Sequence, residues 1–111
     1  MHEMGLAKDV LRKILEEADK RKLRRISRAY VNIGETLITD KEEFLQLFKD
    51  ISVGTPVEGL ELNVTIMPLM AFCKSCSKDF SAKEMKKGCP GCESNDFKIV
   101  SGKEVIIKEL K

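Results

Sequence analysis

Residues 73–92 read CKSCSKDFSAKEMKKGCPGC, and this stretch decides how the chain is organised. It contains two Cys-x-x-Cys pairs that lie twelve residues apart: Cys73 with Cys76, and Cys89 with Cys92. A Cys-x-x-Cys turn directs both thiolates at one ion, and two such turns complete a tetrahedron around Zn(II). The surrounding segment 70–97 has few aliphatic residues and is too small to fold by hydrophobic burial alone. The sequence therefore predicts a four-cysteine zinc site that holds this segment together.

The predicted zinc site has a structural role in this interpretation. Four thiolates fill the coordination sphere and leave no position for water, so catalytic zinc is the weaker hypothesis. A thioredoxin-like dithiol is an alternative, but that chemistry uses one Cys-x-x-Cys at a helix N-terminus and leaves the second pair unexplained. A zinc ribbon that binds nucleic acid or protein is another. Because five lysines in segment 70–97 are nearly matched by four carboxylates, we do not expect nucleic acid as a partner.

Two helices are predicted on the N-terminal side of this segment. Apolar residues recur every three or four positions over residues 4–21, which indicates an amphipathic helix. Thr39-Asp40-Lys41-Glu42 has the pattern of a capping box, with Thr39 as the N-cap, and predicts the start of a second helix. The expected buried face of this helix consists of Phe44, Leu47, Phe48 and Ile51. Gly54 and Pro56 are expected to end it.

Three further segments have β patterns. Residues 25–33 alternate between polar and apolar side chains, and residues 60–67 alternate strictly until Pro68. A β pattern resumes over residues 99–110, with Gly102 as an expected bulge, so we expect the chain to return there to the first sheet. The predicted fold class is α+β: a small mixed three-stranded sheet with two helices, plus an inserted zinc-ribbon-like domain with four cysteine ligands. The expected domains are residues 1–69 with 98–111, and residues 70–97.

The composition limits the classes of protein that remain. With 111 residues the chain can build one modest core, and 42% hydrophobic with 34% charged residues is typical of a folded soluble protein. The longest apolar stretch, residues 67–73, contains Pro68 and is far too short to cross a membrane. The N-terminus lacks the apolar region of a secretory signal, so we expect a cytoplasmic protein. The only histidine is His2, so no hydrolytic triad is possible and we do not expect an enzyme.

His2 suggests a second metal site at the start of the chain. Its imidazole, the free amine of Met1 and the intervening amide nitrogen can form adjacent chelate rings, a planar nitrogen set suited to Ni(II) or Cu(II). The alternative is that residue 2 is frayed and solvated, or that its ring caps the first helix.

Several short motifs occur together in a specific order: Met1-His2-Glu3-Met4, Ile33-Gly34-Glu35, Gly54-Thr55 before Glu58-Gly59, the two Cys-x-x-Cys pairs, and Ser101-Gly102-Lys103-Glu104. Taken together, the chain resembles the HypA family of nickel-incorporation maturation factors for [NiFe]-hydrogenase, from end to end. The resemblance implies a nickel metallochaperone with a nickel-binding domain and an inserted zinc domain. It implies nickel ligands at Met1, His2 and Glu3, the last through backbone nitrogen, and zinc ligands at the four cysteines.

The resemblance also implies partners: a GTPase of the HypB family and the hydrogenase large subunit, with urease as a client in some lineages. The chain departs from the family pattern at Thr36, where the family usually has Leu, and at Asp40-Lys41-Glu42, where it has Pro-Glu. Glu93 replaces a Gly that commonly follows the last cysteine, which predicts a different turn there.

Six cations within nine residues follow the first predicted helix: Lys20, Arg21, Lys22, Arg24, Arg25 and Arg28. A solvated face that complements the helix dipole is the first interpretation. An acidic partner surface and non-specific RNA binding are the alternatives.

Overall fold

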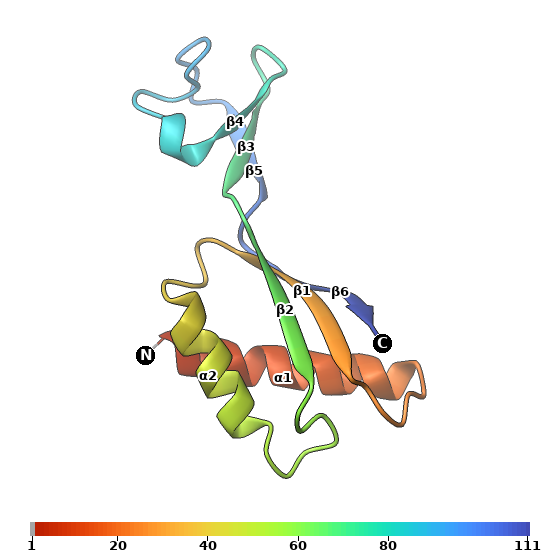
Figure 1. Ribbon diagram of the computed structural model, residues 1–111. Helices are drawn as coiled ribbons and strands as arrows, with labels where there is room; N and C mark the ends of the chain where they lie inside the picture. The colour runs from red at the N-terminus through yellow and green to blue at the C-terminus, as the bar shows by residue number, and fades with distance from the viewer. Residues whose placement is uncertain (1) are drawn as a thin grey trace.

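A computed structural model of the protein describes residues 2–111, apart from the side chain of His2; Met1 lies outside the described residues. The chain forms two lobes joined end to end, with overall extents of 52 × 29 × 16 Å (Figure 1). Two helices and one sheet make up the first lobe, and the second lobe carries the cysteines at the far end. Within the described chain, none of the helices combines the length and apolar character that crossing a bilayer requires.

Helix α1 (His2–Lys20) and helix α2 (Lys41–Ile51) cover one side of the first lobe. The apolar stripe of α1 is buried, with Val10 and Ile14 fully enclosed. In α2, Phe44 and Phe48 are buried, and Leu47 and Ile51 pack partly buried against the same core, so the predicted face is confirmed. Both helices therefore bury the apolar faces that the sequence pattern predicted, and both begin within a few residues of the predicted positions.

The predicted N-cap of α2 is wrong by one residue. Asp40, not Thr39, caps the helix, because its carboxylate accepts the backbone N–H of Glu43 at 3.0 Å. The hydroxyl of Thr39 instead donates to the carboxylate of Glu3 at 2.9 Å. Asp and Thr are both good N-caps. Because the hydroxyl of Thr39 binds Glu3, Asp40 takes the capping position.

The sheet of the first lobe has the order β2-β1-β6, formed by β2 (Glu61–Met67), β1 (Arg28–Gly34) and β6 (Val105–Leu110). Strand β1 pairs parallel with β2 and antiparallel with β6, so the predicted mixed three-stranded sheet is confirmed. The parallel pair requires a crossover connection, which α2 supplies. Ala29, Val31 and Ile33 of β1 are buried on the helix side.

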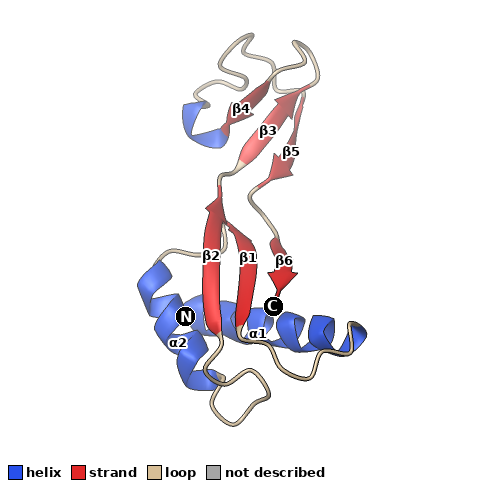
Figure 2. Cartoon of the chain, turned by 45° about the vertical axis from the view of Figure 1, so that its right-hand side comes forward, coloured by secondary structure: helices blue, strands red, loops and turns tan. Residues whose placement is uncertain are grey.

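The second lobe contains an antiparallel sheet with the order β4-β3-β5 (Figure 2). Its strands are β3 (Met70–Cys73), β4 (Asp79–Ser81) and β5 (Phe97–Ser101), and the short 3-10 helix η1 (Ala82–Glu84) follows β4. The core here has four buried residues: Ala71, Cys73, Phe80 and Cys89. Two of these four residues are cysteines, so the stability of this lobe depends on the interaction that holds the cysteines together.

The C-terminal β pattern divides between the two lobes, which differs from the expected single return to the first sheet. Residues 97–101 pair with β3 in the second lobe, and only residues 105–110 pair with β1. The chain therefore crosses back at Gly102 rather than at residue 98. Gly102 is not a bulge within a strand; it lies in the connection between β5 and β6, with a φ of +96° that favours glycine.

Candidate metal centre

The four cysteine sulfurs form one cluster at the tip of the second lobe. All four Sγ atoms lie within 4.8 Å of one another, and the separations are 3.5 Å between Cys73 and Cys92 and 3.6 Å between Cys76 and Cys89. A tetrahedral Zn(II) site with Zn–S bonds of about 2.3 Å has sulfur–sulfur edges of about 3.8 Å. The donor set and its size therefore fit a tetrahedral thiolate-bound metal ion.

Both cysteine pairs are held by the same local turn. After Cys76, Ser77 has a φ of +58° and its N–H donates to the carbonyl of Cys73 at 2.8 Å. After Cys92, Glu93 has a φ of +60° and its N–H donates to the carbonyl of Cys89 at 2.7 Å. Glu93 therefore adopts the left-handed conformation that favours glycine, and its turn matches the one after Cys76 in this chain.

Backbone amides also point at the sulfurs. The N–H of Cys76 donates to Sγ of Cys73 at 3.5 Å, and the N–H of Gly91 donates to Sγ of Cys89 at 3.4 Å. Such donors stabilise thiolates rather than thiols, so each turn is arranged to support a negatively charged ligand.

The pKa values of neighbouring cysteines in the cluster are shifted in opposite directions. The backbone N–H of Cys76 is the main cause that lowers the pKa of Cys73 to about 7. Burial, followed by the neighbouring sulfur of Cys73, raises the pKa of Cys76 to about 12. Burial and the neighbouring sulfurs thus disfavour ionisation of Cys76, and a bound metal ion would favour the deprotonated form of all four cysteines.

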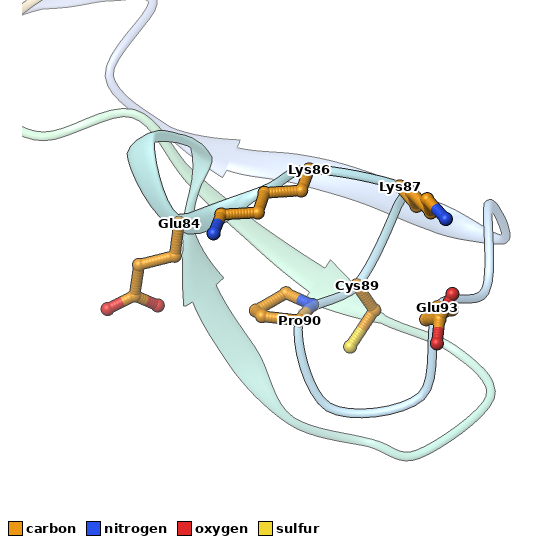
Figure 3. Close-up of a pocket in the computed structure, with 6 residues that line it drawn as sticks. All are labelled: Glu84, Lys86, Lys87, Cys89, Pro90 and Glu93. Atoms are coloured by element: carbon orange, nitrogen blue, oxygen red, sulfur yellow. The ribbon is translucent and has the colours of Figure 1, made fainter.

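A hollow of about 480 Å³ lies beside the cluster, in the loop that carries the second cysteine pair (Figure 3). Its lining contains both charge signs: Glu84, Lys86, Lys87, Cys89, Pro90 and Glu93. Two lysines and two carboxylates together give no strong field for an anionic ligand, which disfavours phosphate or nucleic acid at this hollow.

The start of α1 is fixed by a buried carboxylate. Glu3 is 7% exposed, and its Oε1 accepts the backbone N–H of Thr39 at 2.8 Å and that of Asp40 at 3.3 Å, besides the Thr39 hydroxyl. These donors, led by the Thr39 N–H, hold the pKa of Glu3 below its usual value. Met1 and the side chain of His2 lie outside the described residues. The described part of the predicted nickel set is therefore Glu3, whose Oε1 already accepts hydrogen bonds from the protein.

Sequence reasoning missed Thr39 and Glu35 as residues that organise this region. The sequence pattern predicts Thr39 as a helix cap, because a hydroxyl before Asp-Lys-Glu fits that role equally well. Its true partner, Glu3, lies 36 residues away in the chain. Glu35 follows Gly34 at the end of a strand, and only its position in the Ile33-Gly34-Glu35 motif marked it.

The basic cluster lies at the C-terminal end of α1. There the N–H of Leu23 donates to the carbonyl of Ala18 at 2.9 Å, and Lys22 has a φ of +56°, the geometry of a helix-terminating turn. Arg21 pairs with Glu17 at 3.1 Å. Exposed cations at this end complement the helix dipole, which favours the first of the three interpretations.

The helix-and-sheet lobe and the four-thiol cluster define a small metal-binding protein with a closed thiolate site. The family profile described as "Hydrogenase/urease nickel incorporation, metallochaperone, hypA" matches residues 1–111. The chain therefore belongs to the HypA family, whose members are maturation factors rather than enzymes.

The relatives can be aligned with this chain over nearly its whole length. A hydrogenase maturation factor HypA from Azotobacter chroococcum mcd 1 is 26% identical over 100% of this chain and 98% of the relative. Another, from Legionella pneumophila (strain Lens), is 28% identical over 99% and 97%. The solution structure of the Ni metallochaperone HypA from Helicobacter pylori superposes with a TM-score of 0.73, at 26% identity, and covers 100% of this chain and 97% of that one.

Proposed function

We propose that the protein binds Ni(II) at its N-terminus and delivers it to the hydrogenase large subunit during maturation. The amine of Met1, the imidazole of His2 and backbone nitrogen up to Glu3 form the nickel site. The observation that carries this proposal is the family match, which spans the N-terminus and the four cysteines in one alignment.

The contacts of Glu3 support backbone rather than side-chain coordination at that residue. Its Oε1 already accepts three hydrogen bonds, so a metal ion bound at that oxygen would compete with the amides of Thr39 and Asp40. Its backbone N–H is one of the first four of a helix, which have no acceptor within the helix. That nitrogen can therefore lose its proton and bind a metal ion without breaking a hydrogen bond of the helix.

Zinc is proposed as the resident ion of the four cysteines, with a structural role. In this proposal the nickel-binding domain consists of residues 1–69 and the C-terminal segment that carries β6, and the zinc-binding domain is built on residues 70–97, with the rest of β5 paired to it. The thiolates supply the binding energy that the four-residue core of the second lobe lacks. A HypB-family GTPase is the proposed partner, and the cytoplasm, where thiols stay reduced, is the proposed location.

Nickel titration followed by visible absorption tests the N-terminal site on zinc-loaded protein. We expect the native chain to show the bands of nickel bound to nitrogen in a plane, and His2→Ala to lose them. A chain with an acetylated N-terminus is expected to lose them too, because the amine is a ligand. Equal binding by all three would contradict the proposal. Measuring zinc in each sample confirms that the thiolate site is unaffected.

A further inference from the structure

The two lobes meet where three pieces of backbone pass very close to one another. The hydroxyl of Ser101 donates to the carbonyl of Pro68 at 3.0 Å, which joins the two connecting segments. A side chain added at Gly34 would place its Cβ in direct overlap with the carbonyl group of Gly102. The end of β1 therefore lies directly against both connections to the second lobe.

Glu35 reaches from this junction into the second lobe and contacts it twice. Its Oε1 accepts the backbone N–H of Leu69 at 2.6 Å, and its Oε2 lies 3.6 Å from Nζ of Lys83 in η1. The carbonyl of Leu69 accepts the N–H of Ala82 at 2.9 Å, so Leu69 is itself tied to η1. One carboxylate thus holds both the entry to β3 and the helix that follows β4.

The two contacts differ in strength. Lys83 is 79% exposed, and an ion pair at such a position is weak because water screens it and the long side chain loses freedom. Glu35 is only 23% exposed, and a short hydrogen bond from an amide to a carboxylate is the stronger type. We therefore assign most of the effect to the bond from Leu69.

Glu35 also begins the segment that fixes the start of α1. Residues 35–40 run from the junction to Thr39 and Asp40, whose amides bind the carboxylate of Glu3. In between, the hydroxyl of Thr36 donates to the carbonyl of Gly102 at 2.8 Å. A segment of six residues therefore has the second lobe at one end and the first turn of α1 at the other.

We propose that Glu35 is a positioning residue: chiefly through Leu69 it fixes the orientation of the second lobe, and through residues 35–40 it fixes the amides that hold Glu3. The first half stands on the contacts alone. The second half rests on the proposed function. A change in the second lobe then alters the geometry at the N-terminus, and the reverse also holds.

NMR on zinc-loaded protein tests the first half. Residual dipolar couplings of the β1–β2 and β3–β5 amides report the relative orientation of the lobes. In the native chain we expect one alignment tensor to fit both sheets, whereas Glu35→Ala is expected to require two and to shift the amide resonances of Thr39 and Asp40. Glu35→Gln keeps an acceptor for Leu69 and is expected to remain close to native, as is Lys83→Met. Lys86→Met, an exposed lysine in the same lobe, is the matched control and should change nothing.

The nickel titration tests the second half. We expect Glu35→Ala to weaken nickel binding roughly fivefold, the lower end of ordinary coupling between sites, and to shift the visible bands, while Lys86→Met does neither. A folded Glu35→Ala with one alignment tensor and native Thr39 and Asp40 resonances would overturn the positioning role. Native nickel binding in a Glu35→Ala chain with reoriented lobes would overturn the coupling to the N-terminus. If the native chain binds no more nickel than His2→Ala, the proposed function fails, and the dipolar couplings still decide the first half.

Discussion

The carboxylate of Glu3 accepts the backbone N–H of Thr39 at 2.8 Å and thereby ties the first turn of α1 to the residue before the N-cap of α2. Both helices therefore begin close to this contact, and Glu3 is itself one of the proposed nickel ligands. Because the buried carboxylate of Glu3 accepts three hydrogen bonds, a substitution at this contact should have a clear effect on stability.

Acid should weaken this contact selectively. The folded-state pKa of Glu3 is lowered from 4.5, so its charged form stabilises the fold above about pH 4.5, and this contribution is lost as the pH falls through the folded-state value. We expect Glu3→Gln to be less stable than the native chain at pH 7, with the difference shrinking below about pH 4.5. Urea unfolding at a series of pH values, followed at the helices, measures this difference.

A pH-independent difference would contradict the argument. Thr39→Val serves as the matched variant because it removes the hydroxyl donor and keeps the backbone donor and the carboxylate. Thr39→Val should lose less stability at pH 7 than Glu3→Gln. The stability of Thr39→Val should still fall with acid as that of the native chain does, because the Glu3 carboxylate is kept.

Removing the metal should unfold only the second lobe. Two of its four buried core residues are cysteines of the four-sulfur cluster, whereas the first lobe has a separate core built around Ile14, Val31 and Phe44. We expect a strong chelator to collapse the dispersion of the β3–β5 amides and to leave the helical circular dichroism nearly unchanged. Added zinc should restore the amide spectrum. Loss of the helical signal together with the β3–β5 resonances would show that the lobes fold as one unit.

Two glycines should respond oppositely to alanine. Gly5 lies within α1 with no atom within 4 Å of an added Cβ, so Gly5→Ala should raise stability by about 0.5–1 kcal/mol. At Gly34 an added Cβ would overlap the backbone of Gly102, and Gly34→Ala should lower stability by about 1–3 kcal/mol. Thermal unfolding of both variants checks the pair, and equal responses would contradict the close approach at the junction.

Phe44 should be the most costly aromatic to truncate. It is fully buried between the helices and the first sheet, and its ring lies 6.4 Å from that of Phe48. Phe44→Ala should lose about 3–5 kcal/mol, the usual result of emptying a large core position. Val53, 65% exposed, offers a control: Val53→Ala should stay within about 0.5 kcal/mol of the native chain in urea unfolding.

Sequence patterns predicted the local features and failed where distant residues compete. The strict alternation over residues 60–67 predicted β2 closely, because Leu62 and Val64 pack against the core and the period of a strand is two. The cysteine spacing predicted the cluster, since two identical turns place four sulfurs around one point. The division of residues 99–110 between two sheets was missed, because strands in either lobe have the same period.

The N-cap of α2 and the role of Glu35 between the two lobes could not be predicted from the sequence, again because distant residues determine them. Thr39 and Asp40 are equally suited to cap α2, and the choice depends on Glu3 at the other end of the lobe. Glu35 has an ordinary position after a strand, and its role depends on Leu69, 34 residues later. Contacts of this length are set by packing of whole elements and leave no periodic signal.

The bond between Ser101 and Pro68 means that the polypeptide enters and leaves the cysteine-bearing half at adjacent points. We therefore expect that the segment between Pro68 and Ser101 can be replaced by a short connection, with β2 and β6 still paired to β1. The cysteine-bearing half is in this sense an insertion. We expect that another folded unit whose termini lie equally close together could take its place without a change in the length of β2 or β6.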